Sequence, residues 1–255
     1  MIFDTHAHYD DEQFNEDRVE LLNSMEEQGV GTIINVSATY NSCRKVIALA
    51  KEYPFVYAAV GIHPDEVGSL NEETFAQMKE LFKEEKVVAV GEIGLDYYWE
   101  KEERARARQQ GVFARQMELA RELKLPVIVH DRDAHADCME ITRRYPDVIG
   151  VYHCYAGHIE MARELLERGY YLSFTGVITF KNAKKAIEVI REVPIERLMV
   201  ETDSPYMAPE PFRGRRNSSL YVYRMAEKIA EIKGMPVEDV ERITTENGRR
   251  LFGIV

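Results

Sequence analysis

Cysteine is scarce in this chain, and the spacing of the few that occur suggests no pairing. Cys43, Cys138 and Cys154 are the only three among 255 residues. An odd number of cysteines without a CxxC pair argues against the disulfide frameworks of small secreted domains. We therefore expect three reduced thiols and a cytoplasmic protein, because the cytoplasm keeps thiols reduced.

Long hydrophobic runs and excess positive charge are missing too. No apolar stretch approaches the roughly 18 residues that a membrane-spanning helix needs. Asp4 interrupts any signal region at the start, so we expect no membrane partner. The formal net charge of −11 argues against non-specific coating of duplex nucleic acid. It leaves a nucleic-acid substrate open, because bound divalent cations change the local charge of a site.

Short apolar runs alternate with longer amphipathic segments along the whole chain. In the latter, apolar residues recur every three or four positions, as do Phe113, Met117 and Ala120, which is typical of helices. Strands alternating with helices predict a parallel sheet. Eight such units predict an α/β fold, a single-domain (β/α)₈ TIM barrel over residues 1–255, with an open doubly wound sheet as the alternative. The predicted strands are 2–8, 31–37, 55–63, 86–94, 126–132, 149–157, 170–176 and 198–205.

Potential metal ligands follow the apolar part of five of these strands. In a parallel barrel all strands end at one rim, where active sites form, so these side chains are expected to converge. A lone His-x-His is more often a pair of ordinary imidazoles, but ligands at five strand ends favour a metal site. Six ligands exceed the needs of one tetrahedral zinc and favour two metals. The predicted ligands are His6, His8, Glu92, His130, His153 and Asp203.

Two acidic residues lie one step deeper on the strands that carry ligands. Asp4 precedes His6 by two positions, and Glu201 precedes Asp203 by two. Side chains two apart on a strand share a face, and a carboxylate so placed commonly orients a ligating imidazole. We predict that Asp4 and Glu201 support the ligands, with direct metal contact by Glu201 as the alternative.

The stretch PEPFRGRRN after the last predicted strand is rich in arginine. Guanidinium groups match the geometry of phosphate oxygens. We predict that Arg213 and Arg216 bind substrate phosphate, and that Arg215 belongs to a solvated loop. The aromatic residues of GLDYYWE offer faces on which the bases of a single strand can stack, or else serve packing.

Nine motifs follow one another along the chain: DTHAH, GIHPDE, VGEIGLDYYW, PVIVHDRDA, YHCYAG, YYLSFTG, KNAKK, ETDSPYMAPEPFRGRRN and TTENGRRLF. Together they resemble the TatD-type metal-dependent deoxyribonucleases of the amidohydrolase-like barrel superfamily. The resemblance implies a TIM-type barrel with two divalent ions (Mg, Mn or Zn) that hydrolyses DNA phosphodiesters, as an exonuclease on the 3′ ends of single strands. One departure is HCYAG, where family members usually show HCFSG or HCFTG.

The resemblance also implies a role for each site residue. The ligands divide around a bridging Glu92, with His6, His8 and Asp203 on one metal and His130 and His153 on the other. His63 of GIHP is placed beside the substrate phosphate, where it hydrogen-bonds the phosphate or protonates the leaving oxygen. Asp203 is our choice as the general base, since a carboxylate beside the attacking water can take its proton.

Two other functions remain open from the sequence. Barrels of the same superfamily hydrolyse amides, lactones and phosphoesters, and function depends on the site more than on the fold. A lysine bridging the metals would favour the amidohydrolase type, and this chain has Glu92 at that strand end. A non-catalytic, metal-dependent nucleic-acid-binding module is the second alternative, but all the expected ligands are present. We expect a monomer.

Overall fold

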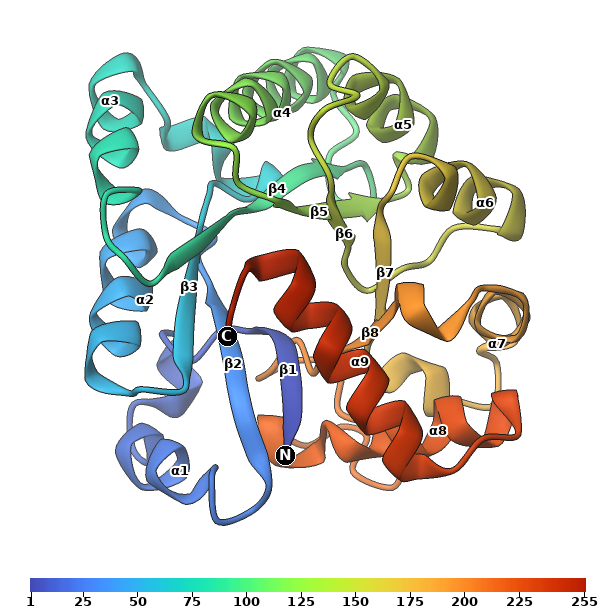
Figure 1. Ribbon diagram of the computed structural model, residues 1–255. Helices are drawn as coiled ribbons and strands as arrows, with labels where there is room; N and C mark the ends of the chain where they lie inside the picture. Colours follow the sequence, from blue (N-terminus) through green and yellow to red (C-terminus); the bar gives the residue numbers. More distant parts are fainter.

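Eight parallel strands pair in sequence order, β1 to β8, and helices surround them (Figure 1). The computed structural model describes residues 1–255, except for the side chain of Ser69. It confirms the predicted single-domain barrel and excludes the open doubly wound sheet. The strands are β1 (Ile2–Ala7), β2 (Val30–Val36), β3 (Val56–Val60), β4 (Val87–Asp96), β5 (Val127–Arg132), β6 (Gly150–Tyr152), β7 (Tyr171–Phe174) and β8 (Leu198–Val200).

A helix follows almost every strand and packs outside the barrel. The α-helices are α1 (Arg18–Ser24), α2 (Tyr40–Glu52), α3 (Glu72–Leu81), α4 (Glu103–Leu123), α5 (His135–Arg143), α6 (Ile159–Glu167), α7 (Lys184–Glu192), α8 (Tyr223–Lys233) and α9 (Val237–Phe252). Short 3₁₀ helices are η1 (Glu12–Phe14), η2 (Pro64–Ser69), η3 (Gly176–Thr179), η4 (Ile195–Arg197) and η5 (Ser219–Tyr221). Within the described part of the chain, no helix has the length and hydropathy of a membrane span.

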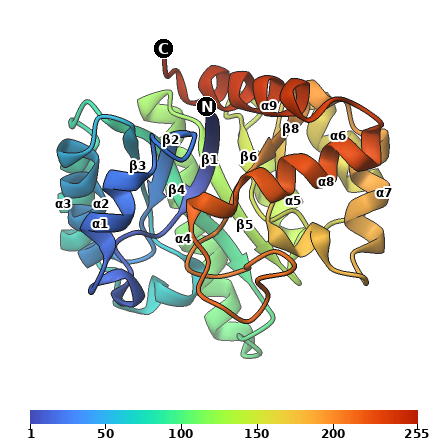
Figure 2. The ribbon, with the colours of Figure 1, turned by 90° about the horizontal axis from the view of Figure 1, so that it is seen from below.

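The inside of the barrel is filled by apolar side chains and closed at one end by α9. Every strand contributes to this inner cluster, and β2 contributes two residues: Phe3, Ile34, Val36, Ala59, Ala89, Ile128, Val151, Tyr171 and Met199. Leu251 and Phe252 of α9 join the same cluster. Figure 2 shows α9 and both termini at one end of the barrel and the loop between β8 and α8 at the other. The interior is therefore a packed core, and a site can form only at the end opposite α9.

Strands β1 and β8 meet at a seam that side chains hold together. The backbone contributes an isolated bridge between Ala7 and Ser204. The fully buried Asp4 carboxylate accepts hydrogen bonds from the backbone N–H of Thr202 at 2.8 Å and from its hydroxyl at 2.5 Å. The Ser219 hydroxyl, at 2.5 Å, donates a third. These bonds satisfy the buried carboxyl oxygens and tie β1 to the residues after β8, although burial still raises the pKa of Asp4 to about 7.

This arrangement corrects the prediction that Asp4 orients the imidazole of His6. The pairing register of β1 shifts between Asp4 and Ala7, so side chains do not alternate regularly there. The Asp4 carboxylate turns towards the residues after β8, whereas the His6 ring stacks on His153 at a centroid distance of 4.1 Å. Asp4 reaches His6 only through the backbone N–H, at 3.4 Å. It therefore positions the strand and not the ring.

The buried thiols lead to a test of the packing. Cys43 and Cys138 are fully buried, and burial raises the pKa of the Cys43 thiol to about 11. A thiol reagent needs both access and the thiolate. We expect Ellman's reagent to modify at most one thiol, that of Cys154, in the native protein, and all three in guanidinium chloride. Rapid modification of two or more thiols in the native state would contradict the packing described.

Candidate metal centre

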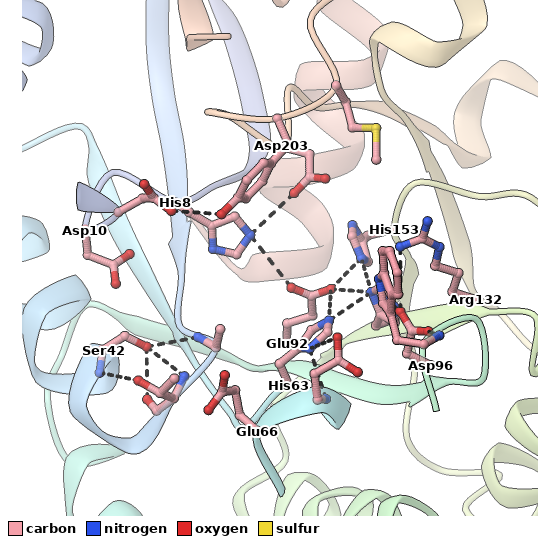
Figure 3. Close-up of a pocket in the computed structure, with 18 of the residues that line it drawn as sticks. His8, Asp10, Ser42, His63, Glu66, Glu92, Asp96, Arg132, His153 and Asp203 are labelled. Carbon is pink, nitrogen blue, oxygen red and sulfur yellow. Dashed lines mark hydrogen bonds and ion pairs between the residues drawn. The ribbon is translucent and has the colours of Figure 1, made fainter. Parts of the chain in front are cut away.

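The predicted ligands converge at the rim of the barrel opposite α9. Figure 3 shows His8, Glu92, His153 and Asp203 turned towards one another across a cavity. His6 and His8, both from the first strand and its end, bring their Nε2 atoms within 3.1 Å of each other. Asp203, which follows β8, places Oδ1 at 3.4 Å from Nε2 of His8 and 3.7 Å from Nε2 of His6. Residues from opposite ends of the sequence thus form one cluster.

Glu92 lies between two sets of imidazoles, and each of its oxygens faces one set. Oε1 is 2.7 Å from Nδ1 of His130 and 2.6 Å from Nε2 of His153. Oε2 is 3.4 Å from Nε2 of His6 and 3.8 Å from Nε2 of His8. A carboxylate in this position can bridge two cations, each with its own imidazoles. Groups of such donors lie within 4.8 Å of one another, so the residues fit a pair of divalent ions.

Two of the imidazoles are oriented by a hydrogen-bonding partner on their far nitrogen. Nδ1 of His8 lies 2.8 Å from the carbonyl oxygen of Val36. Nε2 of His130 lies 3.2 Å from Oδ2 of Asp96. A hydrogen bond to the far nitrogen fixes the tautomer and leaves the near nitrogen free to ligate a metal.

Glu201 lies near the far nitrogen of His153, where a supporting carboxylate is predicted, but that nitrogen has no hydrogen-bond partner. Oε1 of Glu201 lies 3.4 Å from Nδ1 of His153, while the Glu201 oxygens accept bonds from the N–H of Cys154 at 2.6 Å and from the hydroxyl of Ser173 at 2.5 Å. Glu201 is fully buried, and these hydrogen-bond donors stabilise its carboxylate. Direct metal contact remains geometrically open, because His6, His153 and Glu201 also form one of the donor groups.

Asp96 is a site residue that sequence reasoning missed. Strand β4 runs on to Asp96, two residues beyond the predicted strand end. There its carboxylate accepts bonds from the N–H groups of Tyr98 at 2.9 Å and Trp99 at 3.2 Å besides facing His130. The available signal was its position four residues after Glu92, which places it at the same rim.

Electrostatics keep the central carboxylate ionised. Burial alone raises the pKa of Glu92, but its electrostatic interactions with the surrounding imidazoles, that of His153 foremost, outweigh burial and hold the pKa well below its usual range. Burial lowers the pKa of His8 and of His130, yet hydrogen bonds to Asp203 and Asp96 respectively prevail and raise both values to about 9. Without metal, these two imidazoles hold protons at neutral pH.

Metal binding should therefore release protons. Burial lowers the pKa of His153, but the charge of Glu92 outweighs burial and raises that pKa, too, well above its usual range. Ligating imidazoles must be neutral, so the metal ions have to displace the protons of His8, His130 and His153. At pH 7.5 we expect about three protons to be released on saturation with Mn²⁺. Because the raised pKa values keep the imidazoles protonated below about pH 9, the apparent affinity should rise from pH 6 towards pH 9. Calorimetric titrations in two buffers of different ionisation enthalpy measure this release, and heats independent of the buffer would contradict it.

His63 lies beside the cluster, with one nitrogen turned away from it. Its Nε2 is 3.4 Å from Nδ1 of His130 and 3.7 Å from Oε1 of Glu92. Burial and the charge of His130 lower the pKa of His63 to about 3, so the ring is neutral. The N–H of Asp65 donates to Nδ1 at 3.2 Å, which places the ring proton on Nε2. That nitrogen is thus a hydrogen-bond donor aimed at the rim, beside the predicted position of the phosphate.

The two arginines predicted to bind phosphate lie elsewhere. Arg216 forms an ion pair with Asp17, at 2.8 Å for one of its contacts, and also donates to the carbonyl of Gln13. Arg213 lies over the ring of Phe180 at 4.4 Å from its centroid. Neither arginine lines the cavity over the cluster. The loop that follows β8 is long enough to turn both guanidinium groups outward, which strand-end counting cannot foresee.

Arg132 is the arginine that does face the cavity. It ends β5, two residues after His130, and its guanidinium lies 4.0 Å from the ring centroid of Tyr98 and 5.6 Å from that of Trp99. The cavity has a volume of about 760 Å³ and includes Trp99 and Arg132 among its lining residues. Tyr98 and Trp99 of GLDYYWE thus lie near the site, where their rings pack against the guanidinium group of Arg132.

The family model described as TatD related DNase matches residues 3–253. The chain belongs to the TatD family. It is 45% identical over 256 residues to "Uncharacterized metal-dependent hydrolase YabD" of Bacillus subtilis, and the match covers 100% of both chains. It is 32% identical over 261 residues to "3'-5' ssDNA/RNA exonuclease TatD" of Cronobacter sakazakii, covering 98% of this chain and 97% of the other.

A solved structure agrees with this assignment. The crystal structure of YJJV, a TatD homolog from Escherichia coli K12, superposes with a TM-score of 0.93 at 31% identity, over 100% of this chain and 98% of that one. Together with the clustered donors at the rim, these relatives identify a metal-dependent hydrolase of the TatD family.

Proposed function

We propose that this TatD-family hydrolase cleaves the phosphodiester bonds of DNA, as an exonuclease on the 3′ ends of single strands. The observation that carries the proposal is Glu92, whose two oxygens each face a separate pair of imidazoles. That donor set suits two divalent ions, Mg, Mn or Zn. The relative from Cronobacter sakazakii, a "3'-5' ssDNA/RNA exonuclease", supports the choice of substrate.

The ions, when bound, supply positive charge that activates water and neutralises the phosphate oxygens. We assign His6, His8 and Asp203 to one ion and His130 and His153 to the other, with Glu92 between them. The protein contributes rigid placement, because Asp96 fixes the ring of His130 and the buried Glu201 lies 3.4 Å from Nδ1 of His153. Such pre-oriented charge costs no reorganisation during the reaction.

Asp203 is the proposed general base. Burial raises the pKa of its carboxyl, but the hydrogen bond with His8 and the charge of His6 outweigh burial and hold the pKa below its usual range. The group is therefore ionised at neutral pH and able to accept a proton from water at the rim. Asp203 also lines the cavity, so a water bound there can reach it.

His63 is proposed to bind the phosphate as a neutral donor. The N–H at Nε2 faces the rim, where it can donate a hydrogen bond to a non-bridging phosphate oxygen. The lowered pKa favours this role over protonation of the leaving oxygen, since the ring does not carry the second proton that a general acid needs.

A cleavage assay tests the proposal directly. Metal-depleted protein is supplied with Mg²⁺, Mn²⁺ or Zn²⁺ and given end-labelled single- and double-stranded DNA, with His130→Ala as the inactive control. Stepwise shortening of single strands from the 3′ end is the expected result. A parallel panel contains RNA, bis-nitrophenyl phosphate, a lactone and dihydropyrimidine. Turnover of dihydropyrimidine or the lactone alone, or binding of DNA without cleavage under every metal, would overturn the proposal.

A further inference from the structure

A second cavity opens on the other side of the metal centre and differs from the first in charge. Its volume is about 640 Å³, and it shares His130, Arg132, His153, Asp203 and Met207 with the first cavity. The two hollows are therefore one continuous cleft with the metal ligands at its middle. A nucleic-acid strand whose scissile phosphodiester lies at the metal ligands must extend into one hollow or both.

The first hollow is lined by carboxylates. Apart from the ligands Glu92 and Asp203, six acidic side chains line it, against the two cations Lys45 and Arg132. These acidic residues are Asp10, Asp11, Glu12, Asp65, Glu66 and Asp96. Such a surface repels a run of phosphates, although its oxygens can accept hydrogen bonds from sugar hydroxyls.

The second hollow carries the opposite charge. Lys184 and Lys185 line it together with Arg132. Its one acidic residue besides the ligand Asp203 is Asp131, which is paired with His135 at 2.9 Å. Among the ion pairs between described residues, none involves Lys184 or Lys185, and both side chains are exposed.

The place of these lysines in α7 is unfavourable for the helix itself. They occupy its first two positions, and no acidic residue stands in that first turn. A helix N-terminus carries partial positive charge, so cations there cost stability where anions would add to it. A bound anion would reverse that cost, because it would meet both the lysines and the helix terminus.

The wall of the second hollow is apolar and suits a flat ring. Tyr155, Phe174 and Ile178 form its buried part, while Ala156 and Met207 stand at its more exposed edge. The exposed side chain at position 156 is a methyl group, so the edge is open and uncharged. Aromatic and aliphatic surfaces of this kind bind nucleobases without regard to sequence.

We propose that the second hollow binds the nucleotide next to the scissile phosphate, with its base on the apolar wall and the following phosphate on Lys184 and Lys185. This rests on the proposed phosphodiesterase function and assigns the direction in which the strand leaves the metal centre, over η3 and α7 and away from the acidic hollow. The lysines bind a phosphate that does not react, so they contribute affinity for longer substrates and not to the chemistry.

Substrate length is the variable that tests this assignment. We compare the dinucleotide TpT, which has one phosphodiester, with a thymidine pentanucleotide that has four. The Lys184→Ala/Lys185→Ala variant should raise the KM of the pentanucleotide about tenfold, the size of one lost charge-assisted hydrogen bond. For TpT, KM and kcat should stay within twofold of wild type. Lys181→Ala, three residues before α7 and outside both hollows, is the matched control.

A second variant fills the hollow without removing charge. Ala156→Trp places a bulky side chain at the exposed edge, where folding is unaffected, and should also raise the pentanucleotide KM. Salt dependence of pentanucleotide binding adds a readout independent of turnover, because each lost phosphate contact lowers the slope of log K against log salt by about 0.7.

The outcomes separate this inference from the proposed function. Equal loss on TpT and the pentanucleotide would place the lysines on the scissile phosphate and overturn the inference while the nuclease function stands. Unchanged pentanucleotide KM and salt slope in both variants would overturn it too. A wild type that hydrolyses neither substrate refutes the proposed function, and unaltered binding in the lysine variant would then refute the inference separately.

Discussion

Replacing Glu92 by Gln is expected to abolish most of the hydrolytic activity while leaving the fold intact. The amide has nearly the same shape, but it removes the negative charge that lies between the two imidazole sets. We expect kcat to fall at least about a hundredfold, as when one preorganised electrostatic contact is lost from an active site. The metal content should fall from two ions per chain to one or fewer, as measured by inductively coupled plasma mass spectrometry after gel filtration.

The matched control for this variant is Glu188→Gln. Glu188 is exposed on α7 and lies outside both hollows, so the same chemical change there should leave kcat and metal content unaltered. Circular dichroism of both variants verifies the fold. Full activity with two bound ions in Glu92→Gln would remove the basis of the bridging role.

Replacing Asp203 by Asn is expected to separate proton transfer from metal binding. The side-chain carbonyl of Asn can still ligate a metal, but it cannot act as a base at neutral pH. We expect kcat to fall by about 10² to 10⁴, the range of general base catalysis, with KM changed only a few-fold. Two ions should still bind at saturating Mn²⁺. Steady-state kinetics and metal analysis on the same sample measure both quantities.

Asp147→Asn serves as its control, since this exposed aspartate lies outside the cleft. A loss of one ion in Asp203→Asn, with activity restored by excess metal, would show that Asp203 acts as a ligand and not as the base. A kcat within threefold of wild type would exclude both roles.

Strand-end counting located the ligands well where the strands are regular. In β5 and β6, Ile128 and Val151 face the barrel interior, and residues two further on, His130 and His153, reach the rim. In β4 the pairing register shifts between Val90 and Ile93. Ala89 therefore faces the interior, and Glu92 also faces inward although it lies three residues further on, an odd spacing that regular alternation would place on the other face. Counting by twos along β4 therefore fails across the shift, and Glu92 reaches the rim through its position at the strand end.

The residues that sequence reasoning misplaced lie in loops or depend on a strand's length. Arg213 and Arg216 follow β8 in a loop whose path is set by tertiary contacts, among them the ion pair with Asp17. Asp96 was missed because β4 is longer than its apolar run. Loop conformation and strand extension depend on packing between distant segments, and local periodicity carries no information about either.

The seam between β1 and β8 has a consequence for how the protein acquires its ions. His6 and His8 belong to β1 and its end, whereas Asp203 and the Ser219 hydroxyl that donates to Asp4 follow β8, so the rest of the barrel is synthesised between them. A nascent chain consequently presents two exposed imidazoles long before their partners exist. The full set of predicted ligands therefore exists only after β8 and the segment that follows it have been synthesised.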